Sequence, residues 1–136
     1  MVVTELSNKF RNVIFCEDIR DEVGNKKSLM GAIAGDVFVP AFPATIKIAI
    51  YFEYTPEPIE RNQHLSIEFR LLQNDDEIAK GGMEATVQPN QSANFILPMA
   101  LVTFEKEATF RMRAAVNGGP EQELLTKKIS KPSVTS

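Results

Sequence analysis

A regular alternation of apolar and mostly polar residues runs through residues 45–54 and constrains the fold more than any other feature of this chain. Large apolar side chains occupy every second position, at Ile46, Ile48, Ile50, Phe52 and Tyr54. A period of two places them on one face of a β-strand, whereas a helix would scatter them around its circumference. Prolines flank the segment on both sides and cannot donate to a strand ladder. We therefore predict a half-buried strand in the middle of a sheet.

The same period recurs along much of the chain. Residues 64–73 and 78–87 flank a turn rich in Asn and Asp, which predicts a β-hairpin interrupted by a bulge or bend at Gly81-Gly82. A second hairpin is predicted for residues 110–116 and 123–130, joined by an Asn-Gly-Gly-Pro turn. Three further strands are expected over residues 12–20, 28–39 and 95–104, the last bent at Pro98.

These segments follow one another without a helix long enough for a βαβ unit. They predict an all-β fold, an antiparallel two-sheet sandwich of seven to eight strands that is Ig-like or C2-like. A closed barrel is the alternative, because alternation does not decide closure. The 136 residues suit one domain. We expect an N-terminal extension over 1–11, a β-sandwich domain over 12–130 and a flexible tail over 131–136.

Composition narrows the setting and the partners. Hydrophobic residues make up 43% and charged residues 24% of the chain, as in globular proteins, and the net charge of −3 does not favour nucleic acid as a partner. The single cysteine, Cys16, cannot form an internal disulfide, which favours a reducing compartment. Neither a signal peptide nor a membrane-spanning segment is recognisable, so we expect a cytoplasmic protein with no membrane partner.

Residues with catalytic or metal-binding chemistry are sparse. His64, the only histidine, opens a strand on its polar face, and Cys16 lies in an apolar run, so neither is predicted to be catalytic. One Cys and one His do not furnish a typical zinc site, and the acidic turns lack the ligand spacing of a calcium loop. Arg111 and Arg113 share one strand face, where Glu105, Glu107 or Glu123 is expected to pair with them. We predict no catalytic residue, metal or cofactor.

The most distinctive residues lie between Cys16 and Pro43. A Cys-Glu-Asp opening at 16–18 and a Gly-Asp…Pro-x-Phe-Pro continuation at 35–43 resemble a family of small bacterial and phage proteins of unknown function. The resemblance implies an intracellular protein in a bacterial or phage setting and supplies no catalytic residues. We take this segment as the expected working surface, and its candidate binding residues are Glu17, Asp18, Arg20, Asp36 and Phe42.

Asp36 is the candidate with a specific structural expectation. It follows Gly35 in an otherwise apolar predicted strand, so a buried carboxylate there would need a partner, and Arg20 on the adjoining strand is the nearest. A buried structural role, in which Asp36 pairs with Arg20 and fixes register or pairs with backbone amides, is favoured over a ligand site. Gly31 and Gly35, two pleats apart, are expected to leave a flat stripe on the same strand.

The resulting functional hypothesis is a non-enzymatic protein-binding or assembly module. It would present a sheet edge, an acidic loop end or the Gly31–Gly35 stripe to a protein partner or to a second copy of itself. The absence of a recognisable acid–base pair makes an enzyme the less favoured hypothesis. The alternatives are a small-molecule enzyme or ligand binder using the Cys16–Asp36 region, and a calcium-dependent binding domain. An exposed apolar edge would favour the binding module, and a concave pocket lined by ionisable groups would favour the enzyme.

Overall fold

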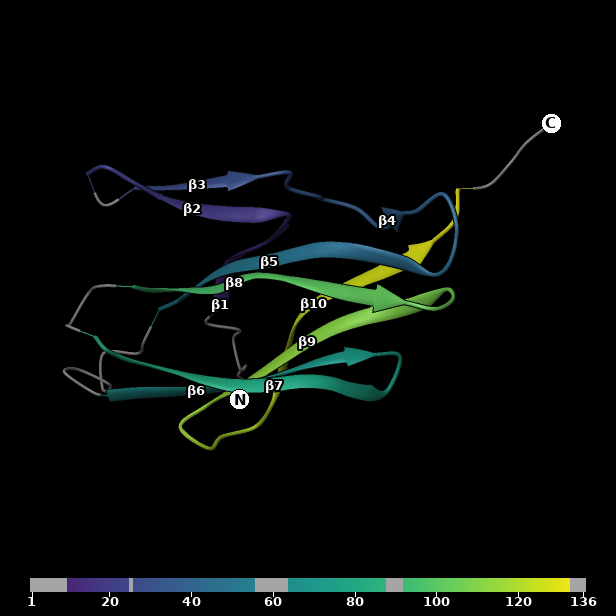
Figure 1. Cartoon of the computed structure of the whole chain (residues 1–136). Helices are drawn as coiled ribbons and strands as arrows, with labels where there is room; N and C mark the ends of the chain where they lie inside the picture. The colour runs from purple at the N-terminus through teal and green to yellow at the C-terminus, as the bar shows by residue number, and fades with distance from the viewer. Residues whose placement is uncertain (1–9, 25, 56–63, 88–91, 133–136) are drawn as a thin grey trace, which may run out of the picture.

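The structure is a computed structural model, and residues 10–24, 26–55, 64–87 and 92–132 of it are described. The described residues form ten strands and no helix, so the all-β prediction is confirmed (Figure 1). The strands are β1 (Phe10–Cys16), β2 (Asp18–Glu22), β3 (Lys26–Met30), β4 (Val37–Phe38), β5 (Ala44–Tyr54), β6 (His64–Gln73), β7 (Asp76–Thr86), β8 (Ala93–Phe104), β9 (Ala108–Val116) and β10 (Gln122–Ser130).

The strands are arranged in three sheets rather than the two that the sequence predicted. One sheet has the order β1-β5-β8, a second has the order β4-β10-β9-β6-β7, and β2 and β3 pair as a separate ribbon. Figure 1 shows this ribbon on one side of β5 and β8, with β9, β6 and β7 on the other side. The pairing of β4 with β10 is parallel, which the antiparallel prediction did not include.

The third sheet exists because both predicted N-terminal strands are divided. The expected strand 12–20 breaks at Glu17 into β1 and β2, and the expected strand 28–39 breaks after Met30 into β3 and β4. Gly31 has a φ of +69°, a left-handed conformation that ends the extended segment and that glycine adopts without strain. The predicted flat stripe of Gly31 and Gly35 is therefore absent, since residues 31–36 are not in a strand.

β5 is the central strand of its sheet, as predicted. Ile48, Ile50, Phe52 and Tyr54 are buried, while Ile46 near the start of the strand is only partly buried. Their side chains belong to a core that both larger sheets share. Phe110 of β9 links the sheets, because its ring packs against two rings of the other sheet. The centroid of the Phe110 ring lies 5.9 Å from that of Phe15 on β1 and 6.2 Å from that of Phe104 on β8.

Both predicted hairpins are present, β6 with β7 and β9 with β10. The bulge in the first hairpin lies at Ile78, between the pairs Leu71–Ala79 and Leu72–Glu77, rather than at Gly81-Gly82. Gly81 is regularly paired with Phe69, and a Cβ there would come within 2.9 Å of the Phe69 ring. Close approach of that ring, not a bend, therefore explains the glycine.

The described part of the chain contains no helix that is long and apolar enough to cross a membrane. Residues 1–9 of the expected N-terminal extension and residues 133–136 of the expected tail lie outside the described residues.

Candidate functional site

The free edge of β8 is an exposed strand edge without charged residues. Within the described residues β8 pairs only with β5. Its twelve residues include no charged side chain, in a chain that is 24% charged. The run from Pro98 to Leu101 is exposed, and Leu101 retains 66% of its accessible surface.

A bulge divides this strand at its middle. The register with β5 shifts between the pairs Ile48–Ala100 and Ile50–Leu97, so Pro98 and Met99 both lie opposite Ala49. Proline cannot donate a ladder hydrogen bond and is tolerated at edges and bulges, which confirms the predicted bend at Pro98. Pro98 and Met99 line different clefts, Pro98 the inner one and Met99 the outer one.

The inner cleft, on the core side of β8, has a volume of about 190 Å³ and an almost entirely apolar lining. It opens where the edge strands β7 and β8 of the two larger sheets approach each other, and among the described residues Lys80 is the only charged one in its lining. The other residues around it are Ile48, Ile50, Phe69, Leu71, Ala79, Leu97, Pro98, Ala100 and Val102. Apolar side chains of both sheets are thus accessible beside a free strand edge.

The outer cleft, on the other side of β8, has a volume of about 160 Å³ and lies under the β2–β3 ribbon. Three of the candidate residues from the sequence come together here, and the lining consists of Glu17, Asp18, Arg20, Met30, Lys47 and Met99. The guanidinium Nε of Arg20 lies 3.3 Å from Oδ2 of Asp18, in a partly exposed ion pair.

Glu17 connects this cleft to the break in the N-terminal strands. Its amide donates to the Met30 carbonyl at 2.9 Å, and its carboxylate covers Gly31, where a Cβ would lie 2.6 Å from Oε1. Within the described structure, neither the Glu17 carboxylate nor the Lys47 ammonium forms an ion pair or a side-chain hydrogen bond. The lining of the outer cleft therefore includes two methionines and two charges of opposite sign that have no partner among the described residues.

The other two candidate residues lie elsewhere. Asp36 is exposed, and its Oδ1 accepts a hydrogen bond from the backbone amide of Lys128 at 3.0 Å. The predicted burial of Asp36 and its pairing with Arg20 are therefore wrong, whereas the alternative prediction, pairing with a backbone amide, is confirmed. The break after Met30 carries Asp36 away from β2 and towards β10. Phe42 is partly buried and packs against the core, outside both clefts.

Cys16 and His64 lie in different sheets and have different partners. Cys16 is fully buried, and its thiol donates weakly to the carbonyls of Ala49 at 3.5 Å and Asp18 at 3.6 Å. Burial raises the pKa of the Cys16 thiol above its ordinary value. His64 is exposed and lies 2.6 Å from a carboxylate oxygen of Glu84 on β7. Among the described residues, no group of three or more His, Cys, Asp or Glu side chains is placed to hold a metal ion.

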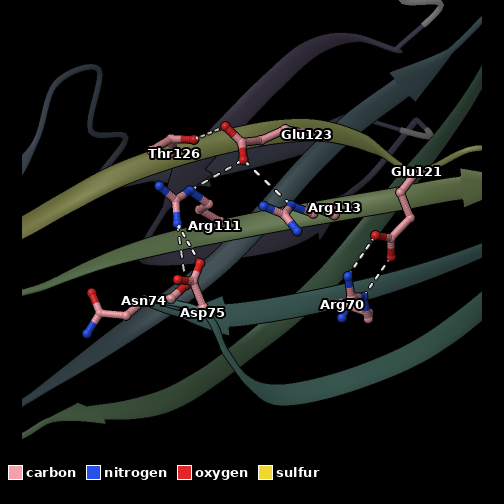
Figure 2. Close-up of polar contacts among 8 residues, drawn as sticks. All are labelled: Arg70, Asn74, Asp75, Arg111, Arg113, Glu121, Glu123 and Thr126. Carbon is pink, nitrogen blue, oxygen red and sulfur yellow. Dashed lines mark hydrogen bonds and ion pairs between the residues drawn. The ribbon is translucent and has the colours of Figure 1, made fainter.

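The outer face of the five-stranded sheet carries a network of arginines and carboxylates (Figure 2). Arg70 donates two hydrogen bonds of 2.7 Å to Glu121, which lower the pKa of that carboxyl. Arg111 and Arg113 lie 3.4 Å and 3.7 Å from the same Glu123 oxygen, which confirms the predicted pairing of these arginines with a carboxylate. A broad hollow of about 610 Å³ lies beside the Arg70–Glu121 pair, above Gly81 and Gly82. The charges of these three arginines are thus balanced within the sheet.

Lys127 is a structural residue that the sequence analysis missed. It is only 7% exposed, and its ammonium donates hydrogen bonds of 2.8–2.9 Å to the carbonyls of Ile33, Ala34 and Gly35. The alternation of apolar and polar residues in the last strand could have predicted the burial of Lys127, because Lys127 lies two residues before Ile129 and shares its inward face. The three hydrogen bonds hold the segment between β3 and β4 against β10.

The model of the family described as "Family of unknown function (DUF6941)" matches residues 11–125, which extend from β1 into β10. No curated protein matches the chain. The matched segment covers most of the chain and includes β8 and every residue that lines the two clefts. On this evidence the chain belongs to DUF6941, a family of unknown function.

Proposed function

We propose that this protein is a non-enzymatic protein-binding or assembly module, and that its binding surface is the free edge of β8. The observation that carries the proposal is a twelve-residue edge strand without a charged residue, exposed from Pro98 to Leu101. Unpaired amides and carbonyls on such an edge form a template for a strand of another chain.

The other edge strands carry features that discourage pairing with a strand of another chain. β7 carries Asp76, Glu77, Lys80 and Glu84, and β4 is only two residues long. β1 has a register shift after Arg11, and both strands of the β2–β3 ribbon carry charged residues. Charges, prolines, bulges and short length are the usual protections of edge strands. β8 has a proline and a bulge at Pro98, but its pairing with β5 is regular from Ala100 to Phe104. Of the edge strands longer than two residues in the described structure, β8 alone lacks a charge.

The surroundings of β8 suit an added strand. Side chains of a strand alternate between the two faces of its sheet. A guest strand along β8 would therefore direct one set of side chains towards the inner cleft and the other towards Met99 and Leu101. Main-chain hydrogen bonds supply affinity in this mode of recognition, and the pockets beside the edge supply specificity.

The dimensions of the two clefts beside β8 suit single side chains of a partner better than a small molecule bound at this edge. Their volumes of about 160 and 190 Å³ lie below the roughly 300–1,000 Å³ that is usual for ligand pockets. Each cleft accommodates a side chain or two, as expected for subsites of a longer, extended partner.

Site-specific photo-crosslinking tests the proposal in cells that make the protein naturally. Leu101 is replaced by a benzophenone amino acid, and Val23, which is 95% exposed in the β2–β3 turn, receives the same replacement as a control. We expect protein adducts from position 101 only, mapping by mass spectrometry to an extended segment of the adduct. Adding Ala100→Asp, a charge on the cleft side of the edge, should abolish them. Equal adducts at both positions, or none at position 101, would contradict the proposal.

A further inference from the structure

We infer, resting on the proposed function, that the strand bound at the β8 edge is β8 of a second copy of this chain. The two strands pair antiparallel around a two-fold axis that passes near Leu101. This pairing joins two three-stranded sheets into one continuous sheet across the dimer.

The charge pattern supports a second copy as the occupant. In a symmetric interface the same patch supplies both sides, so every residue of the edge meets a residue of the same edge. Like charges that face each other across strands are destabilising. β8 brings no charge into such a pairing, so no like charges meet in any register of the two copies, whereas an axis at Lys80 of β7 would set Lys80 against its own copy and Asp76 against Glu84.

Exposure along β8 places the axis in its C-terminal half. On the outer face of the sheet, Ile96 before the bulge is partly buried, whereas Leu101 after the bulge is 66% exposed and is the most exposed large apolar residue of β8. After the bulge the pairing with β5 is regular from Ala100 to Phe104. An axis beside Leu101 places the two Leu101 side chains against each other and removes both from water.

The neighbouring apolar residues extend the buried surface. In an antiparallel pairing about an axis normal to the sheet, the outer faces of the two sheets lie on the same side. Met99 and Leu101 are on this face, and Met30 of β3 lines the same outer cleft as Met99. Met30 and Met99 are each 43% exposed, and methionine adapts its shape readily to a partner surface. One apolar patch thus continues from each copy into the other.

Solution mass over a range of protein concentrations is the first test. The purified full chain should reach twice its 15.2 kDa mass in light scattering or sedimentation. Leu101→Lys should raise the dimer Kd about tenfold or more, as loss of a central interface contact does. Ile78→Lys, the same change at a 40% exposed residue of the β7 edge, is the matched control and should leave Kd unchanged. Thr103→Lys provides a second β8 charge if Leu101→Lys does not fold.

A cysteine scan locates the axis. Met99, Ala100, Leu101, Val102 and Thr103 are each replaced by Cys, one at a time, while the buried Cys16 remains in place. Directly opposed antiparallel residues have Cα atoms about 4.5–5.5 Å apart, within the range of a disulfide. In a symmetric pairing only a residue close to the axis meets its own copy, so disulfide formation should peak at position 101 and fall away on both sides.

Different results would overturn self-pairing of β8 and the proposed binding function of its edge. A monomer at every concentration, or disulfides that form more readily at Gly82→Cys on β7 than anywhere on β8, would overturn self-pairing. If position 101 then still crosslinks to a different protein in cells, β8 remains a binding edge with another partner. If position 101 gives neither a dimer nor a specific adduct, self-pairing and the proposed function both fall.

Discussion

The ammonium nitrogen of Lys127 lies 2.8 Å from the backbone carbonyl oxygen of Gly35, a residue 92 positions earlier in the chain. Two more carbonyls of the same segment complete the set of acceptors, and the Phe15 ring centroid lies 5.7 Å from the nitrogen. A buried ammonium requires such partners, because burying it without them would cost far more than the contacts return. This contact connects the segment 31–36 to the last strand of the five-stranded sheet.

Replacing Lys127 should therefore loosen that segment. Lys127→Met keeps an apolar stem of similar length and removes the three charge-assisted hydrogen bonds, and we expect a loss of about 1–3 kcal/mol in the free energy of unfolding. Lys128→Met, at the exposed neighbouring position, should change it by less than about 0.5 kcal/mol. Urea denaturation of both variants measures the difference. Equal stabilities would show that Lys127 does not hold the segment.

Asp36→Ala should have a small effect. The carboxylate is exposed and accepts one backbone amide, so we expect a loss of about 0.5–1.5 kcal/mol rather than the larger penalty of a broken buried ion pair. Arg20→Ala should be nearly neutral, because its pair with Asp18 is largely exposed. A thermal melt of each variant checks both expectations. A loss of several kcal/mol in the free energy of unfolding of Asp36→Ala would contradict the exposed position of this carboxylate.

Ile48→Ala tests the core beneath β5. The side chain is 4% exposed and packs between the two larger sheets, so its truncation should cost about 2–4 kcal/mol. Lys47→Ala, one residue away on the opposite face, should cost less than about 0.5 kcal/mol because Lys47 is exposed and unpaired among the described residues. Chemical denaturation of the two variants gives the comparison. A loss below about 0.5 kcal/mol for Ile48→Ala would mean that the side chain is not buried and that the register of β5 described here is wrong.

The Arg70–Glu121 pair should contribute to stability in a pH-dependent way. Hydrogen bonding to Arg70 lowers the pKa of Glu121 below its ordinary value of 4.5. A carboxyl with a lowered folded-state pKa contributes stability that is fully present above the unfolded pKa and is lost as pH falls through the folded pKa. We therefore expect Glu121→Gln to melt below wild type at pH 7 and to converge with it well below pH 4.5. A gap that stays constant with pH would contradict this account.

The Cys16 thiol should resist alkylation in the native protein. It is fully buried, and burial raises its pKa, so little reactive thiolate is accessible. Iodoacetamide at pH 7.5 should leave the folded chain unmodified and modify it readily in guanidinium chloride, as intact mass shows. Rapid modification of the folded protein would mean that β1 opens locally and exposes the thiol.

Several elements follow from the sequence alone because their cause is local. The alternation from Ile46 to Tyr54 has one solution, a strand with one buried face, and the structure buries four of those five side chains fully. The two hairpins are equally local, because turn residues such as Asn74 and Asn117 tolerate the positive φ that the structure shows. Pro98 likewise marks a bulge because proline has no amide to donate.

Tertiary structure alone decided how these strands were distributed among sheets. The breaks at Glu17 and after Met30, where the chain leaves one sheet for another, depend on contacts between distant segments such as that of Lys127 with the carbonyls of residues 33–35. The outer cleft brings Glu17 next to Lys47 and Met99, which are far away in the sequence. The lack of charge along β8 is visible in the sequence, but it has no meaning until the fold makes β8 an edge. Periodicity records which face of a strand is buried, whereas strand order depends on packing between residues that the sequence does not place side by side.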